Sequence, residues 1–465
     1  MSVPRVSRLL LASTALAGFM MPTTLSAQAF GLNEIGSCAI ARGFATTATP
    51  CKDASTIFWN PAGATRIDGW NVSLGVASIA LSADFHQDTT GRKFSANPPT
   101  RFVPHGFLNY HKAGSQLAYG IGFYVPYGLT SQWPNDFPGR FEATKASLAT
   151  FYIQPNIAFQ IDSNWSVGGG PIYGHSSVEL IQALDLSAQK TPVGPTFGQL
   201  GVPQFTQFGT ARLKGDASAW GAQIGVWGRI NDHWNVGLRL LSQLSFKYDN
   251  ADATFTQVPT NLLLGADLPG TTLKQGTPFD AILAPQFTTG GALVSQKVST
   301  KIDHPAQAQV GASYSGWKNW LLEADYAWVN WKSFDKLPVT FAGPAPSDTL
   351  IENYNNTSSI RLGAEYTIPT DGWKLRAGFV GASSAAPAET VTPLLPEQDR
   401  YYWNFGIGVP LGKGFTADGT YAHVFTNGAR GRIIERTSPT QPADLNSGVF
   451  NIAANIFAIT LRATF

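Results

Sequence analysis

Residues 457–465, at the end of the chain, read FAITLRATF, and this stretch decides the fold class. Successive side chains of a β-strand point to opposite faces. One face of this stretch is apolar and carries Phe457, Ile459, Leu461, Ala463 and Phe465. The other face carries Ala458, Thr460, Arg462 and Thr464. The alternation predicts a strand with one apolar and one wet face.

A second stretch, residues 234–248, alternates in the same way over a greater length. Apolar residues fill every second position except at Ser242, and Leu241 interrupts the polar face. Trp234 and Tyr248 stand at its two ends, as in the aromatic girdles of a membrane barrel. Strands of soluble sandwiches are usually about half this length. The stretch therefore predicts a membrane-spanning strand.

The same alternation predicts about fourteen strands along the chain. They cover residues 70–85, 102–113, 116–128, 148–161, 164–180, 212–230, 233–249, 300–315, 319–334, 358–368, 372–383, 399–411, 414–427 and 449–465.

The connections between these strands alternate between short and long. Tight turns rich in Gly, Asn, Asp and Pro occupy residues 112–115, 162–164, 231–232, 315–318, 369–372 and 412–414. The other connections are long, and 250–299 is the longest. An even strand count with this alternation is typical of bacterial outer-membrane proteins. We therefore predict an all-β fold, a 14-stranded antiparallel transmembrane β-barrel in the outer membrane of a Gram-negative bacterium.

The composition fits this fold and excludes the main alternative way of crossing a bilayer. Charged residues make up 13% of the 465 residues, aromatic residues make up 12%, and glycine occurs 47 times. After residue 29, no apolar run approaches the 18 or so residues of a membrane-spanning helix. Only a closed barrel, which pairs all of its backbone groups, could then cross the membrane.

Residues 1–29 have the pattern of a secretory signal peptide. Arg5 and Arg8 precede an apolar core, and the segment ends in Ala27-Gln28-Ala29, so cleavage after either alanine is open. Removing the segment leaves 30 basic and 30 acidic residues. A net charge near zero argues against nucleic acid as a partner.

Cys38 and Cys51 are the two cysteines of the chain. In an oxidising periplasm, a pair so close in sequence predicts a disulfide. Two unpaired thiols are the alternative, and two cysteines alone are a poor metal site.

No catalytic, metal or cofactor site is predicted. The chain contains neither Gly-x-Ser-x-Gly nor His-Glu-x-x-His, and its seven histidines are scattered. An outer-membrane hydrolase stays open only as a distant alternative, because a catalytic triad need not be local in sequence.

Two blocks of sequence resemble the FadL-type outer-membrane transporters of long-chain fatty acids and hydrocarbons. The first runs from Phe30-Gly31-Leu32-Asn33-Glu34 through Ala41-Arg42-Gly43 to the segment 53–63, DASTIFWNPAG. The second runs from 124–129, YVPYGL, through Trp133 and 137–141, FPGRF, to 151–156, FYIQPN. The resemblance implies a signal peptide at 1–29, a plug at 30–69 that folds into the lumen, and a fourteen-stranded barrel at 70–465.

The resemblance also implies roles for particular residues. Plug and ligand-binding roles fall on Phe30, Leu32, Asn60, Pro61 and Ala62. A kinked third strand with a lateral opening falls on Gly120, Gly122, Pro126 and Gly128, since Gly and Pro often mark a broken ladder. The alternatives are a purely structural plug and a bend without a gap.

The apolar runs in the longest loop predict a landing surface for ligand, because exposed apolar patches usually mark binding surfaces. In the family, the connections that correspond to 181–211 and 250–299 form a hydrophobic groove. Its predicted residues are Leu262, Leu263, Leu264, Ile282 and Leu283. Ordinary loop packing is the alternative.

The predicted function is passive uptake of hydrophobic small molecules by a monomer with a lateral exit. A ligand carboxylate could meet any of several cations, and none is favoured among Arg140, Arg239, Lys247, Arg361 and Arg376. Further expected partners are outer-membrane lipid, lipopolysaccharide and the barrel-assembly machinery, which would recognise the strand that ends in Phe465. A general diffusion porin is the nearest alternative, although it needs no plug, and a surface adhesin leaves the plug motifs unexplained.

Overall fold

The computed structural model describes residues 29–187, 189–190, 194–268, 270–387, 390–431 and 447–465. Its helical elements are α1 (Ser37–Ala41), α2 (Thr56–Trp59), η1 (Pro61–Arg66), η2 (Pro138–Phe141), η3 (Gly198–Leu200), α3 (Phe279–Leu283), η4 (Ala284–Phe287) and η5 (Trp331–Ser333). Its strands are β1 (Gly69–Gln87), β2 (Lys93–Ala96), β3 (Arg101–His111), β4 (Leu117–Gln132), β5 (Lys145–Gln160), β6 (Trp165–Asp185), β7 (Gln207–Arg229), β8 (Trp234–Leu241), β9 (Leu244–Gln257), β10 (Gln296–His304), β11 (Gln307–Tyr314), β12 (Trp320–Val329), β13 (Lys336–Phe341), β14 (Asp348–Ile351), β15 (Thr357–Thr367), β16 (Lys374–Ala382), β17 (Arg400–Gly412), β18 (Phe415–Thr426), β19 (Ala429–Gly431) and β20 (Gly448–Thr464).

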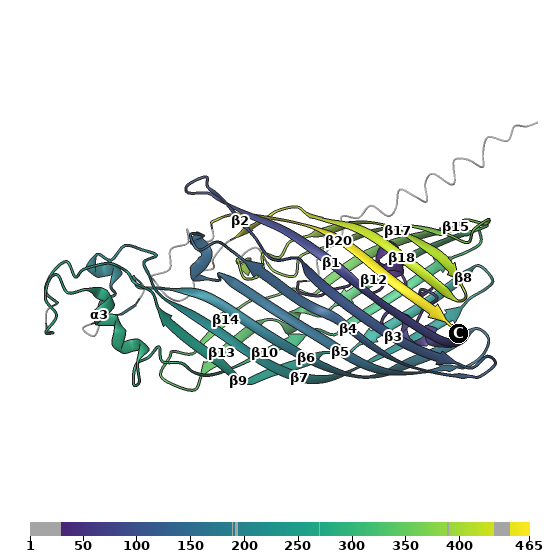
Figure 1. The fold of residues 1–465 in the computed structure, drawn as a ribbon, viewed down its shortest axis with the longest axis horizontal. Coiled ribbons are helices and arrows are strands. Elements are labelled where there is room, and N and C mark those ends of the chain that lie inside the picture. The colour runs from purple at the N-terminus through teal and green to yellow at the C-terminus, as the bar shows by residue number, and fades with distance from the viewer. Residues whose placement is uncertain (1–28, 188, 191–193, 269, 388–389, 432–446) are drawn as a thin grey trace, which may run out of the picture.

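These segments form a closed antiparallel barrel of fourteen strands, as predicted (Figure 1). The first and last strands close it, with Asn71 of β1 opposite Thr464 of β20 and Gln87 opposite Gly448. β8 with β9, and β10 with β11, are each one wall strand in two pieces. β2, β13, β14 and β19 extend hairpins beyond the wall strands.

Two predicted strands proved to be interrupted. Residues 242–243 break the predicted strand 233–249, because the backbone N–H of Ser242 donates to Ala222 and its hydroxyl accepts from the same residue. Residues 305–306 break the predicted strand 300–315, where Pro305 has no N–H to donate. A third strand, predicted at 319–334, ends at Val329 because the chain turns into η5.

Burial confirms the alternation predicted for residues 457–465. Phe457, Ile459 and Leu461 are exposed on the outer surface of β20, whereas Thr460 is buried on the inner surface. Short turns gather at the end of the barrel that holds the C-terminus, and α3 with the long loops lies at the opposite end (Figure 1). Among the described residues, no helix has the length and apolarity needed to cross a membrane, a result that has no bearing on strands.

The segment from Ala29 to Ile67 packs inside the barrel, and most of its residues are buried. Helix α1 contacts β16, β17, β18 and β20, and η1 contacts β5, β6 and β7. We call this segment the plug. The signal-peptide prediction concerns residues that, apart from Ala29, lie outside the described part of the chain.

Candidate functional site

Hydrogen bonds of the Asn60 side chain attach the plug to the barrel wall. Its side-chain amide donates to the carbonyl of Thr47 at 2.7 Å and to that of Val226, in β7, at 3.0 Å. Its side-chain oxygen accepts from the N–H of Ala62 at 3.2 Å. Pro61 begins η1, a position that suits proline because no N–H is required there. Asn60, Pro61 and Ala62 therefore fix the plug to the wall and lie away from the cavity described below.

Glycines of the wall make room for the plug, a signal that the sequence predictions missed. A Cβ atom on Gly168 would lie 2.6 Å from the carbonyl oxygen of Pro61. A Cβ on Gly237 would lie 2.0 Å from the carbonyl oxygen of Thr47. Such distances are too short for any side chain, so the backbone of the plug touches the backbone of the wall. Inward-facing glycines in otherwise regular strands could have indicated these contacts.

One buried ion pair and one hydrogen-bonded carboxylate hold the other half of the plug. Arg42 pairs with Glu323 of β12 at 2.7 Å, and both side chains are buried. The carboxylate of Asp325 accepts from the N–H groups of Thr46 and Thr47, each at 3.0 Å. Each charge therefore has a partner, as buried charges require.

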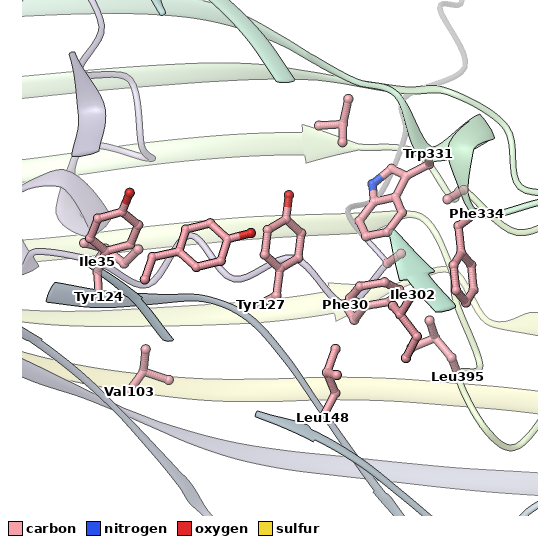
Figure 2. Packing of buried hydrophobic residues seen from close by; sticks show 14 of the residues in the cluster. Phe30, Ile35, Val103, Tyr124, Tyr127, Leu148, Ile302, Trp331, Phe334 and Leu395 are labelled. Carbon is pink, nitrogen blue, oxygen red and sulfur yellow. The ribbon is translucent and has the colours of Figure 1, made fainter. Parts of the chain in front are cut away.

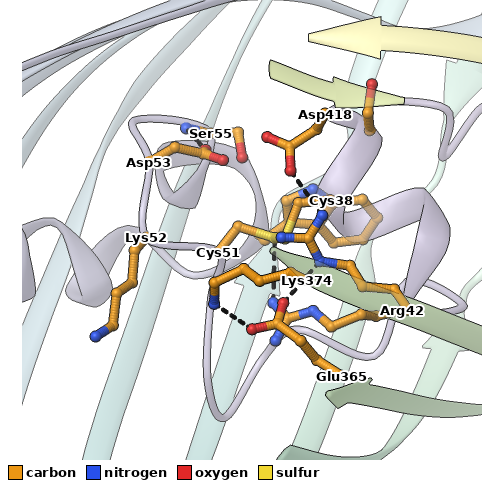
Figure 3. The surroundings of a disulfide bond; sticks show 12 residues. Cys38, Arg42, Cys51, Lys52, Asp53, Ser55, Glu365, Lys374 and Asp418 are labelled. Carbon is orange, nitrogen blue, oxygen red and sulfur yellow. Dashed lines mark hydrogen bonds and ion pairs between the residues drawn. A yellow bond between two sulfur atoms is a disulfide. The ribbon is translucent and has the colours of Figure 1, made fainter. Parts of the chain in front are cut away.

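Cys38 and Cys51 form a disulfide in the structure, with their Cα atoms 6.2 Å apart. Figure 3 shows the disulfide beside Arg42, close to Glu365 and Asp418 of the wall. The guanidinium of Arg42 also donates to the carbonyl of Thr49 at 2.9 Å. The bridge thus closes the loop 38–51, which carries the contacts of Arg42, Thr46 and Thr47 with β12.

The first residues of the plug lie in an aromatic pocket. The ring of Phe30 lies 4.7 Å from that of Trp331 and 5.4 Å from that of Phe334, both in edge-to-face geometry. Tyr127 and His304 approach it at 6.0 and 5.8 Å. Figure 2 shows Phe30 between Tyr127, Trp331 and Phe334. Its location in an apolar pocket fits the role implied by the resemblance, and its displacement by ligand stays a prediction.

The same segment adds a short strand to β4. The N–H of Leu32 donates to the carbonyl of Pro126 at 2.8 Å, and the N–H of Gly128 donates to the carbonyl of Phe30 at 2.9 Å. Gly31 and Tyr127 form the bridge between these two bonds. The plug therefore pairs with β4 where β3 would normally do so.

The pairing of β3 with β4 stops partway along the wall. It covers β3 only from Gly106 to His111 and ends on β4 at Phe123. The rest of β3, from Arg101 to His105, stays paired with β1 on its other side. β4 continues along β5 after a shift in register between Tyr124 and Tyr127. The two strands therefore diverge and leave a break in the ladder.

The four predicted opening residues fall on both sides of this break. Pro126 and Gly128 lie in the diverging part of β4. Gly120 and Gly122 instead lie in the paired part, opposite Asn109 and Phe107. A Cβ on Gly120 would lie 2.6 Å from the Cδ1 of Ile57 in the plug, so this glycine makes room for the plug.

A cavity of about 360 Å³ extends from the plug to the break. Leu32 borders it from the plug, and β1, β4 and β20 contribute mostly aliphatic side chains. Its lining includes Val103, which is buried on the inner face of β3, and Phe102, which is 69% exposed on the outer face. The cavity therefore reaches both faces of the wall at the break.

The cations in the cavity lining differ from those considered in the sequence. Arg400, at the start of β17, and Arg101 border the cavity, and none of the five predicted cations does. Arg376, for example, is bound to Glu365 and Asp418. Arg400 was missed because nothing in its local sequence places it beside the plug.

At the far end of the barrel, the two predicted loops share one hydrophobic cluster. Leu264 and Leu283 are buried in it beside Leu186 and Phe197 of the preceding long loop. Leu262 and Ile282 pack against it and are partly buried. Leu263 is 62% exposed and is the member of the predicted groove that most clearly faces outward. Leu264 and Leu283 therefore join the two loops, and a ligand-binding role of the surface stays a prediction.

Comparison with known proteins now identifies the class of barrel. The sequence profile of the family described as outer membrane protein transport protein (OMPP1/FadL/TodX) matches residues 18–465. The chain belongs to this family. It is 24% identical over 409 residues to the long-chain fatty acid transport protein of Escherichia coli O6:H1, covering 84% of this chain and 86% of that protein.

Solved structures show the same fold. A FadL homologue of Pseudomonas aeruginosa superimposes with a TM-score of 0.77 at 19% identity, covering 94% of this chain and all of the other. The toluene transporter TodX of Pseudomonas putida gives a TM-score of 0.66 at 15% identity, with 94% of this chain and 100% of TodX covered.

Membership of the FadL/TodX family confirms the predicted location and class. The protein resides in the outer membrane, and its family consists of transporters for hydrophobic molecules. It is a transport channel and not an enzyme, so the hydrolase alternative is set aside.

Proposed function

We propose that this barrel takes up hydrophobic small molecules passively, and that they leave sideways between β3 and β4. The ligand class comprises long-chain fatty acids and aromatic or aliphatic hydrocarbons. Similarity to a fatty acid transport protein and to a toluene transporter supports this class.

The observation that carries the proposal is the overlap of the cavity with the break in the wall. The cavity is bordered by Leu32 of the plug at one end and by Phe102, on the outer face of β3, at the other. A solute in it would be shielded from water along the whole path. Releasing an alkyl chain into the periplasm would instead cost about 0.8 kcal/mol for each exposed CH₂ group.

The plug explains how such a break is tolerated in lipid. An unpaired backbone group in a bilayer costs several kcal/mol. The pairing of Phe30 and Leu32 with Pro126 and Gly128 satisfies part of the free edge of β4. Movement of the plug would then change both the aromatic pocket and the edge of the opening.

The loop cluster supplies the first contact for the solute. Leu263 and Leu200, one from each long loop, are exposed apolar residues at the end of the barrel opposite the C-terminus. We assign the initial capture of ligand to this surface, where lipopolysaccharide and water otherwise exclude a hydrophobic solute.

The test is to fill the outer mouth of the opening. Ala149, on the exposed face of β5, borders the cavity. Ala377, on the exposed face of β16, serves as the matched control because it does not border the cavity. Ala149→Trp should reduce uptake of a hydrophobic probe such as toluene into proteoliposomes by about tenfold, since an aromatic ring would occupy the mouth.

Ala377→Trp should leave uptake within about twofold of the wild type, since lipid-facing aromatic residues are tolerated in barrels. Unchanged uptake in a folded, heat-stable Ala149→Trp barrel would mean that the solute passes through the plug instead. The monomeric state is a further proposal. Recognition by the assembly machinery of the final strand, which ends in Phe465, is another.

A further inference from the structure

A second cavity, of about 370 Å³, lies at the end of the barrel where the short turns gather (Figure 1). The plug contributes Lys52 and Arg66 to its lining, and β7 contributes Trp227 and Arg229. The short turns of bacterial outer-membrane barrels face the periplasm, so we call this cavity the periplasmic pocket. Within the described part of the chain, it shares no lining residue with the apolar cavity at the break between β3 and β4.

Two guanidinium groups lie beside the indole ring of Trp227. The Cζ atom of Arg66 lies 4.3 Å from the centroid of this ring, and that of Arg229 lies 5.9 Å from the same centroid. Distances up to about 6 Å allow cation–π attraction. The indole is itself fixed, because it is 5% exposed and its Nε1–H donates to the carbonyl of Ala48 at 2.7 Å. One rigid ring therefore positions a cation of the plug and a cation of the wall.

The positive charge of the periplasmic pocket exceeds the negative charge of its lining. The charged lining residues are three cations and one carboxylate, namely Lys52, Arg66, Arg229 and Asp232. Among the described residues, no carboxylate oxygen lies within 4.0 Å of the charged nitrogens of these three cations. Asp68, the carboxylate that attracts Arg66, is itself paired with His111 at 2.9 Å. The pocket can therefore receive an anion.

The donor groups of the periplasmic pocket suit a phosphate group. A guanidinium presents its N–H groups as a fork that matches two phosphate oxygens, and lysine adds a point charge. Partial burial lowers the pKa of Arg66, and the charge of Arg229 lowers this pKa further, so the two guanidinium groups repel each other. A bound anion relieves that repulsion. The volume of about 370 Å³ lies at the lower end of the range for small-molecule sites.

We propose that the periplasmic pocket binds a phosphate group, carried either by a small phosphate ester or by the headgroup of a phospholipid. Arg66 and Arg229 bind the phosphate oxygens, and Lys52 adds to the positive potential. The two sources share this phosphate chemistry, and they differ in whether alkyl chains accompany the phosphate. The site is independent of the proposed uptake of hydrophobic solutes, because it lies in a different cavity.

The test is titration calorimetry on the purified full barrel, at neutral pH, in an uncharged detergent and a buffer without phosphate. The probes are glycerol 3-phosphate, a free phosphate ester, and dihexanoyl phosphatidylglycerol, a phospholipid with short chains. Glycerol, which lacks the phosphate, is the uncharged control. At least one probe should bind saturably with a Kd below about 1 mM, and glycerol should not bind. The affinity should fall as salt is added, because salt screens the attraction.

Variants of the pocket connect this binding to its cations. Arg66→Gln and Arg229→Gln each remove one guanidinium and should weaken binding of the phosphate probe by about tenfold or more. Lys52→Gln changes an exposed side chain and should weaken binding by about threefold. The matched control is Lys214→Gln, which removes an exposed positive charge near the other end of β7 and should leave the affinity within about twofold of the wild type.

Binding of glycerol 3-phosphate supports a site for free phosphate esters, and binding of the phospholipid alone supports a headgroup site. Absence of saturable binding of both probes would overturn the proposal. A folded Arg229→Gln barrel with unchanged affinity would overturn it as well. If neither arginine variant folds, an unchanged affinity in Lys52→Gln has the same consequence. The uptake test at Ala149 is decided separately, so either proposal can fail without the other.

Discussion

Replacing Phe30 with alanine should loosen the start of the plug without unfolding the barrel. Phe30 is 4% exposed and packs edge-to-face against Trp331 and Phe334. Removing a buried phenylalanine side chain costs about 3–5 kcal/mol. Since about 1.4 kcal/mol corresponds to a factor of ten, local opening should become about a hundredfold to a few thousandfold more frequent.

Hydrogen exchange of two amides reports this opening directly. The N–H of Leu32 and that of Gly128 are both bonded across the junction between the plug and β4. Their exchange should accelerate in Phe30→Ala by the factor above, up to the rate of a free amide. Amides in the paired part of β20 should keep the exchange rates of the wild type, because the barrel wall is unchanged.

The matched control is Phe208→Ala, which removes a buried ring from the separate hydrophobic cluster of the two long loops. It should leave the exchange of Leu32 and Gly128 unaltered. An acceleration below about tenfold in Phe30→Ala, or an equal acceleration in the control, would refute the reasoning that the aromatic pocket holds the plug closed.

Three further perturbations test the seating of the plug. Gly237→Val would place a Cβ 2.0 Å from a plug carbonyl and should raise single-channel conductance, whereas Gly265→Val, with open space around it, should not. Arg42→Met leaves the buried Glu323 without its ion-pair partner and should lower the stability of the plug by about 3–5 kcal/mol. The measurement is hydrogen exchange, in which the amides of the plug should exchange faster. Adding Glu323→Gln to Arg42→Met should restore part of the lost stability. Equal plug stabilities in the single and double variants would contradict the Arg42–Glu323 pair. Replacing both cysteines by serine should lower the stability of the plug by about 3 kcal/mol, on the chain-entropy model for a separation of 13 residues. An unchanged stability of the plug would argue against a bracing role of the disulfide.

Much of the architecture was predictable because the period of a strand is local. Apolar residues at every second position, as in 457–465, assign a face to each side chain without any knowledge of its neighbours. The turns between strands are equally local, since Gly, Asn, Asp and Pro favour tight backbone conformations. The family motifs at 53–63 and 124–129 led to the predictions of a plug and of a kinked third strand.

The contacts between the plug and the wall were decided only by the tertiary structure. The sequence predicted a break in the wall at Gly120, yet this glycine makes room for Ile57 of the plug. The pairing of β3 with β4 ends beyond Phe123 instead. Leu264 and Leu283 were predicted to line an exposed groove, yet they are buried in the hydrophobic cluster that joins the two long loops. Arg400 donates a hydrogen bond to the carbonyl of Ala29, which lies 371 residues away in the sequence. Alternation fixes which face a side chain occupies, whereas the closure of the barrel determines which distant residues share the lumen, and no local pattern contains that information.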